Sequence, residues 1–159
     1  SETFLVADLG TACAIGDREF SELQTSHYRS PEIIMGHREW NEKIDIWSFG
    51  CIVFECITGH YLFKGENDED YITSFIETVG IPSPKFLSQC REKREYFNRD
   101  DKYRFAQDLE PMSIDRLLQE SFAFERQTAN TIYMIIQPML IWDIDSRWPA
   151  KKLLTLYDI

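Results

Sequence analysis

Residues 44–57 read IDIWSFGCIVFECI, a segment that is apolar almost all round. A helix of this composition is expected in the centre of a domain, because any face turned to water would expose apolar surface. Gly59 follows two residues later and is placed to end the helix. The segment therefore predicts a buried central helix.

Composition places the chain in one class of protein and excludes others. Its 159 residues include 17 Lys and Arg against 27 Asp and Glu, giving a net charge of −10, and 43% are hydrophobic. This is enough apolar material for one globular domain. The acidic balance disfavours direct nucleic-acid binding, and it fits either a basic partner or nothing more than solubility. No apolar run approaches the roughly 20 residues of a membrane-spanning helix, so no membrane association is expected.

Cysteine and histidine spacing argues against a structural metal site. The four cysteines form no CxxC pair, and the three histidines form no HxxxH pattern. A reduced intracellular compartment is therefore favoured over a disulfide framework. Since the chain begins at Ser1 rather than Met, we expect a fragment or a processed product.

Outside the central helix, the pattern remains mostly helical. Residues 68–79 repeat apolar side chains at one-face spacing, and Gly80 closes that helix. Residues 125–142 predict a long helix whose last turns are bent by Pro138. Two shorter helices are expected, one capped by Ser113 and one running from Pro149 to Leu156.

The beginning of the chain reads differently. Phe4 to Ala7 is a short apolar run that predicts a buried strand. Residues 11–31 show little periodicity and predict a long loop, which is usually functional inside a compact domain.

Four short motifs follow one another along the chain. They are Asp8-Leu9-Gly10, Ser30-Pro31-Glu32, the segment 45–50, and Asp143-Ile144-Asp145-Ser146-Arg147. Each alone is ordinary: a turn, a helix cap or a surface cation. Together and in this order they resemble the C-terminal lobe of a eukaryotic protein kinase. The resemblance implies that residues 1–159 are part of a kinase domain with a mainly α fold, an activation segment at 8–32 and lobe helices at 33–159.

The kinase resemblance assigns a role to each motif. Asp8 would hold Mg²⁺, a hard ion that bridges ATP phosphates and prefers carboxylate ligands. Leu9 would pack as an apolar plug, and Gly10 would permit the backbone turn. Glu32 and Arg147 would form a buried ion pair that fixes architecture rather than chemistry. Asp45 would accept hydrogen bonds from the backbone of the catalytic loop.

Further motifs narrow the resemblance to the group that contains the cyclin-dependent, tyrosine-regulated, LAMMER and SR-protein kinases. Within it, the chain most resembles the SR-protein kinase family. The supporting pieces are Leu23-Gln24-Thr25 followed by Tyr28-Arg29-Ser30, Ala7-Asp8-Leu9-Gly10, Tyr61-Leu62-Phe63, Asp68-Glu69-Asp70, Glu95-Tyr96-Phe97-Asn98-Arg99 and Pro138-Met139-Leu140. The resemblance implies a Ser/Thr kinase that uses ATP and Mg²⁺ to phosphorylate Arg/Ser-rich splicing factors. It further implies a monomer in cytoplasm and nucleus.

Several acidic positions carry functional expectations. Glu22 stands where tyrosine-regulated relatives carry a phosphorylated Tyr, and a fixed carboxylate there fits a kinase active without modification. The alternative is a solvated loop acid. Asp70 and Glu77 are two helical turns apart on one face, where SR-protein kinases dock Arg-Ser repeats. The alternative is a merely soluble helix face.

The sequence also departs from the family. His60 stands where the family has an acid in the docking groove, and Glu110 where it has a Lys. Ser26 and Asn67 replace arginines that hold substrate phosphate, so of that basic set only Arg29 remains. Both the handling of already phosphorylated substrate and processive phosphorylation are therefore in doubt.

Several sequence motifs that kinase catalysis needs do not occur in these residues. No Gly-rich loop, third-strand Lys or His-Arg-Asp catalytic loop is found, so the general base and most ATP contacts lie outside this chain. We therefore expect no catalytic base here and no activity from the chain alone. Two alternatives stay open: another kinase of the same group, or a non-catalytic module that binds basic peptides.

Overall fold

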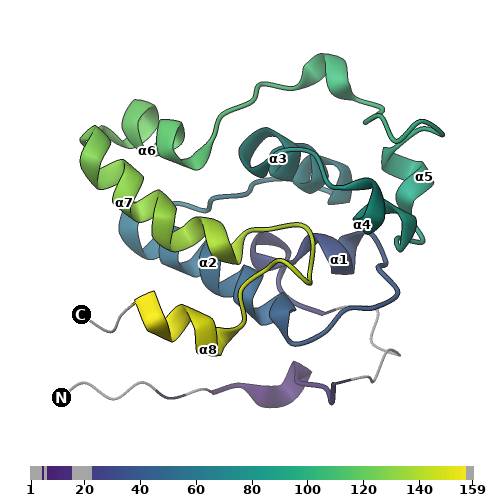
Figure 1. Ribbon diagram of the computed structural model, residues 1–159, viewed down its shortest axis with the longest axis horizontal. Coiled ribbons are helices and arrows are strands. Elements are labelled where there is room, and N and C mark those ends of the chain that lie inside the picture. Colours follow the sequence, from purple (N-terminus) through teal and green to yellow (C-terminus); the bar gives the residue numbers. More distant parts are fainter. Residues whose placement is uncertain (1–4, 6, 16–22, 157–159) are drawn as a thin grey trace.

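The computed structural model describes residue 5, residues 7–15 and residues 23–156 (Figure 1). These contain no β-strand, and only two isolated antiparallel bridges, His37 with Cys90 and Phe97 with Tyr103. Within the same residues, no helix has the length and apolar character needed to cross a membrane. The α-helices are α1 (Pro31–Ile34), α2 (Lys43–Thr58), α3 (Asp68–Val79), α4 (Pro84–Ser88), α5 (Lys93–Tyr96), α6 (Ile114–Phe122), α7 (Arg126–Ile136) and α8 (Ala150–Leu153). The 3₁₀ turns are η1 (Leu9–Thr11), η2 (Ser26–Tyr28), η3 (Ala106–Asp108), η4 (Gln137–Met139) and η5 (Leu154–Leu156).

The central helix forms where the sequence predicts it. α2 lies among the other helices, contacts η2, η4 and α7, and ends at Gly59, whose φ of 75° is favoured by glycine (Figure 1). Trp47 and Phe54 are fully buried on its inner side. Gly50 lets the helix approach η4, since a Cβ there would lie 3.0 Å from Met139 Cβ. Helix α2 therefore packs against elements from both the beginning and the end of the described chain.

The prediction that α2 is buried on every side is wrong for one face. Phe49 and Ile52 are 45% and 42% exposed, and Asp45 lies on the same face. Within the described part of the chain the packed side of α2 is the opposite one, formed around Trp47, Cys51 and Phe54. Composition reports how apolar a helix is, whereas burial depends on which elements reach it.

The helix at 68–79 is confirmed with the predicted bounds. Tyr71, Ile72, Phe75 and Ile76 are buried, as their spacing predicts, and the helix ends at Gly80. Asn67 caps it by accepting the N–H of Asp70 at 3.0 Å. Phe75 packs edge-on against Trp47 at 5.0 Å, which fixes α3 against α2.

The helix predicted over 125–142 is shorter than expected. α7 ends at Ile136, and Pro138 lies in the 3₁₀ turn η4 rather than in a bent helix. Proline lacks the N–H that would continue the helix, so the chain leaves the α conformation there. Of the two shorter helices, Ser113 occupies the N-cap position of α6 without a side-chain capping bond. The terminal helix is present as α8 followed by η5.

The predicted strand at 4–7 is not found in its described residues. Leu5 and Ala7 are neither in a strand nor buried, with Leu5 85% exposed; Phe4 and Val6 lie outside the described residues. A strand needs a partner for its backbone, and the described residues provide none here. In Figure 1 the described residues 7–15 run along the lower edge of the molecule.

Candidate functional site

The predicted long-range ion pair is present and fully buried. Arg147 Nη1 and Nη2 donate to the two Glu32 carboxylate oxygens at 2.5 and 2.8 Å, across 115 positions of sequence. Arg147 also donates to the carbonyl oxygens of Ile141 and Lys43, each at 2.9 Å. Its guanidinium lies 5.1 Å from the centre of the Trp47 ring. This pair anchors the end of the 23–32 segment to the turn that follows η4.

The 23–30 loop is fastened to α2 by Gln24, which the sequence indicated only as part of a motif. Its amide nitrogen donates to the Ile44 carbonyl at 2.8 Å and to Ser48 Oγ at 2.7 Å. Its amide oxygen accepts the backbone N–H of Ser30 at 3.0 Å and the Ser30 hydroxyl at 3.1 Å. Gln24 has a φ of 63°, a left-handed conformation that this bonding holds in place.

An aromatic cluster holds the same loop against α2 and α3. Tyr28 donates its hydroxyl to Glu55 at 2.7 Å, and this bond, with burial, raises the pKa of Tyr28 to about 12. His27 stacks on Tyr61 with ring centres 4.1 Å apart, and its Nδ1 shares a hydrogen bond of 2.9 Å with the Tyr71 hydroxyl. The loop is therefore ordered by contacts with both helices.

Arg29 connects the loop to the acidic start of α3. Its guanidinium donates to the Leu23 and Gln24 carbonyls at 3.0 and 3.1 Å, and Nη1 lies 3.8 Å from Asp68 Oδ1. The candidate phosphate-binding arginine is thus already engaged by loop carbonyls and by one carboxylate. Glu22, the other charged candidate of this segment, lies outside the described residues.

The two candidate docking acids are only partly available. The expectation that α3 presents Asp70 and Glu77 freely to solvent needs correction, because both are half-buried. Asp70 Oδ2 accepts the backbone N–H of Glu66 at 2.8 Å. Glu77 Oε1 accepts the backbone N–H of Glu110, also at 2.8 Å. Each acid fixes a neighbouring loop with one oxygen, since a carboxylate at the edge of a helix is the strongest acceptor within reach.

Glu77 lies between two hollows of the surface. The smaller one, of about 290 Å³, is lined by Glu77, Glu110 and Phe122 among others. It therefore brings together the candidate docking acid Glu77 and Glu110, the residue that stands where the family has a Lys. Neither Asp70 nor His60 lines it; the His60 ring instead lies 5.3 Å from Phe122. The residues that the sequence assigns to one docking groove therefore do not all line the same hollow: Glu77 and Glu110 line this one, and Asp70 and His60 do not.

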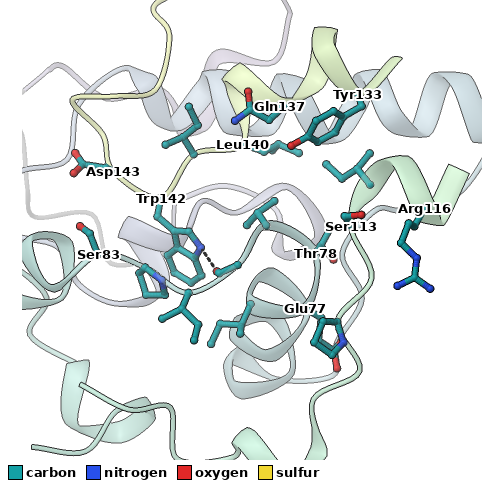
Figure 2. Close-up of a pocket in the computed structure, with 18 residues that line it drawn as sticks. Glu77, Thr78, Ser83, Ser113, Arg116, Tyr133, Gln137, Leu140, Trp142 and Asp143 are labelled. Carbon is teal, nitrogen blue, oxygen red and sulfur yellow. Dashed lines mark hydrogen bonds between the residues drawn. The ribbon is translucent and has the colours of Figure 1, made fainter. Parts of the chain in front are cut away.

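The larger hollow, of about 690 Å³, was not predicted. Figure 2 shows it between the end of α3, the start of α6 and the end of α7, with Arg116 and Tyr133 on its border. Trp142 donates its indole N–H to the Gly80 carbonyl at 2.8 Å and so forms part of its wall (Figure 2). The residues come from three separate segments with no shared motif, so the sequence offered no signal for this hollow.

The Asp8 motif is exposed and does not have the predicted internal packing. Leu9 is 66% exposed, so among the described residues it is not packed as an apolar plug. The turn uses Asp8, whose φ is 59°, rather than Gly10, and the segment closes locally through a bond from the Ala12 N–H to the Leu9 carbonyl. Asp tolerates this left-handed conformation better than most residues.

Asp8 and Asp45 can each supply an oxygen ligand or acceptor. Mg²⁺ is commonly held by one or two carboxylates together with substrate phosphates, and the exposed Asp8 carboxylate fits one such ligand. Among the described residues no group of three or more His, Cys, Asp or Glu could hold a metal by itself. Partial burial by neighbouring atoms raises the pKa of the Asp45 carboxyl, because desolvation disfavours its charged form.

Comparison with known proteins agrees with this architecture. A protein kinase domain model matches residues 1–156. Protein kinase dsk1 of Schizosaccharomyces pombe is 36% identical over 157 residues, covering 94% of this chain and 28% of its own length. A serine/threonine-protein kinase SRPK of Physarum polycephalum is 31% identical over 153 residues, covering 92% of this chain and 36% of its own. Human SRSF protein kinase 3 is 33% identical over 155 residues, covering 94% and 27%.

The chain belongs to the protein kinase family and, within it, to the SR-protein kinases. It spans about a third or less of the length of these three relatives. Protein kinases generally use ATP and Mg²⁺ for phosphoryl transfer.

Proposed function

We propose that this chain is the substrate-binding part of an SR-protein kinase whose full-length form transfers the ATP γ-phosphoryl group to Ser in Arg/Ser-rich proteins. In this proposal residues 8–32 are the activation segment, and Asp8 supplies one Mg²⁺ ligand beside ATP. The observation that carries the proposal is the 23–30 loop, which Gln24 and Tyr28 hold against α2 beside the acidic start of α3. A loop held in place in this way pre-organises a peptide-binding surface, because less entropy is lost on binding.

The acidic residues around α3 supply the proposed specificity. Glu66, Asp68 and Glu69 are exposed there, and Asp70 and Glu77 keep one carboxylate oxygen each beyond those bonded to loop N–H groups. Arg side chains of a substrate bind carboxylates through paired hydrogen bonds. Negative charge along one helix therefore favours peptides with repeated Arg.

The test is peptide binding by isosteric variants. Asp70→Asn with Glu77→Gln removes two negative charges yet keeps a carbonyl oxygen to accept each loop N–H. We expect a labelled Arg-Ser octapeptide to bind this variant at least about tenfold more weakly in fluorescence anisotropy, which corresponds to about 1.4 kcal/mol. Binding by the unaltered chain should also weaken as salt rises, because exposed charges are screened.

A matched control removes the same charge elsewhere. Glu42→Gln with Glu125→Gln alters two exposed acids away from α3 and should leave peptide binding unchanged. Equal binding by both double variants would contradict the docking role of α3. Thermal unfolding of each variant checks that the loops remain folded.

Phosphotransfer needs a separate assay, since the catalytic loop is not among these 159 residues. We expect the chain alone to be inactive with Mg²⁺-ATP, and a full-length protein containing it to phosphorylate the Arg-Ser peptide. Asp8→Asn should abolish that activity while leaving peptide binding intact. A full-length protein that binds the peptide but never phosphorylates it would instead favour a non-catalytic Arg-peptide-binding module.

A further inference from the structure

A basic cleft is lined by residues of α4, α5 and the loops next to them. Its volume is about 720 Å³, and its lining includes the buried apolar side chains of Leu87 and Phe97. Among the described residues no carboxylate lines it. The cationic side chains that line it are Arg38, Arg91, Lys93, Arg94, Arg99 and Arg104. They represent six of the 17 Lys and Arg in a chain whose net charge is −10, so positive charge is concentrated at this place.

Backbone hydrogen bonds bring these cations together from distant positions. Beside the bridge between His37 and Cys90, the Arg38 N–H donates to the Gln89 carbonyl at 3.1 Å and the Arg91 N–H to the Gly36 carbonyl at 3.2 Å. On the other side, the Arg104 N–H donates to the Tyr96 carbonyl at 2.9 Å, and the Arg104 side chain adds a bond from Nη1 to the Arg94 carbonyl, also at 2.9 Å. Backbone hydrogen bonds therefore bring together the segments that carry these cations.

The carboxylates of Glu92 and Glu95, on the same segment, do not line the cleft. Burial, followed by the charges of Asp68, Glu95, Glu92 and Glu69, raises the pKa of Tyr96 to about 12, so these four carboxylates lie near the Tyr96 hydroxyl. Tyr96 is not among the residues that line the cleft, so this negative charge is separate from the cationic lining.

Only part of the positive charge is neutralised within the protein. Lys93 pairs with Asp101. Among the described residues, Arg91, Arg94 and Arg99 have no ion-pair partner. Like charges crowded in one concavity repel one another, so the arrangement gains stability when an anion enters it.

We propose that this basic cleft binds a peptide segment that carries phosphoserine. A phosphoserine carries a charge of about −1.5 to −2 and three acceptor oxygens, which match the paired N–H groups of arginine. The volume is in the range of ligand pockets and accommodates a few residues of peptide. Nucleic acid fits less well, because an acidic chain of pI 4.7 repels a long polyanion that needs many cations in a row.

The proposal does not depend on phosphotransfer by this protein. It concerns a cleft that no residue of α3 lines, so it and the Arg-Ser docking role can fail independently. A probe without arginine keeps the two surfaces distinct in experiment.

The test uses the full 159-residue chain and a fluorescein-labelled nonapeptide of Gly and Ala with two phosphoserines separated by two residues. We expect anisotropy to report binding at least tenfold tighter than that of the same peptide with unmodified serines. Inorganic phosphate should compete, and binding should weaken with salt. Arg94→Glu with Arg99→Glu should weaken phosphopeptide binding at least tenfold.

Two further variants make the result specific. Arg126→Glu with Lys151→Glu gives the same change in net charge at exposed positions outside the cleft and should bind as the unaltered chain does. Arg94→Gln with Arg99→Gln should weaken binding less than the Glu pair, and it replaces that pair if circular dichroism shows the Glu pair to be unfolded.

Three outcomes would overturn the proposal. They are equal binding of the phosphorylated and unmodified peptides, an equal loss in the Arg126/Lys151 control, and tighter binding of a single-stranded RNA nonamer than of the phosphopeptide.

Discussion

Removing Arg147 is expected to destabilise the domain more than removal of any surface ion pair. Arg147→Met replaces a fully buried guanidinium by an apolar side chain of similar length. The Glu32 carboxylate, itself fully buried, then loses both of its charged donors. Breaking one side of a buried ion pair costs about 3–5 kcal/mol, because a charge is left without compensation.

Two carbonyl groups add to this cost. The oxygens of Ile141 and Lys43 lose the donors that Arg147 provides, and a buried group left unsatisfied costs about 1–3 kcal/mol. These contributions overlap, so we expect a total loss near 5 kcal/mol. That amount is between a third and the whole of the stability of a typical domain, so the urea midpoint of the variant should fall sharply.

Urea unfolding followed by tryptophan fluorescence and circular dichroism measures the loss. Glu32→Leu combined with Arg147→Met removes both charges, and should be more stable than Arg147→Met alone by about 2 kcal/mol or more. The exposed pair of Lys85 and Asp145 offers a control, since Lys85→Met should leave the urea midpoint unchanged. An Arg147→Met protein within about 1 kcal/mol of the unaltered chain, or a double variant no better than the single, would refute the reasoning.

Other parts of the structure give further expected outcomes. Gly50→Ala should lower the free energy of unfolding by about 1–3 kcal/mol, because its Cβ would lie 3.0 Å from that of Met139; a urea midpoint at or above that of the unaltered chain would contradict this. Burial lowers the pKa of His37, so the unfolded chain binds the proton more readily; stability should therefore fall as pH drops below about 6.5, and His37→Asn should remove this slope from the thermal midpoint. Gln24→Ala removes two donated and two accepted hydrogen bonds, and should speed hydrogen exchange in residues 23–30 while α3 stays protected.

Local sequence patterns predict a helix correctly where apolar spacing alone decides the structure and nothing competes with it. α2 and α3 have near-continuous or one-face apolar spacing and a glycine after the last turn, so their bounds agree with prediction. Around Pro138 helix propensity competes with a missing backbone donor, and α7 ends before the predicted bend. The apolar run at 4–7 predicts a strand, but a strand also needs a pairing partner, and no local sequence pattern specifies that partner.

Site residues divide according to how their position is determined. The Glu32–Arg147 pair spans 115 positions and was predicted only because the motifs resemble those of kinases. Gln24 lies in a loop without periodicity, and its role depends on a left-handed backbone that brings its amide between α2 and Ser30. Such a role follows from three-dimensional placement, which the residue type alone does not reveal.

The α3 acids show why a charge pattern alone overstates a binding surface. Helical spacing correctly places Asp70 and Glu77 on one side of α3, yet each also accepts a hydrogen bond from a loop N–H. A carboxylate has two oxygens, so in the proposed docking role one fixes the loop while the other binds a substrate arginine. Under that proposal the same groups contribute to both stability and recognition, and only variants that keep the acceptor while removing the charge can separate these contributions. Charge reversal at these positions would disturb the loops as well, so its effect on peptide binding would not by itself demonstrate docking.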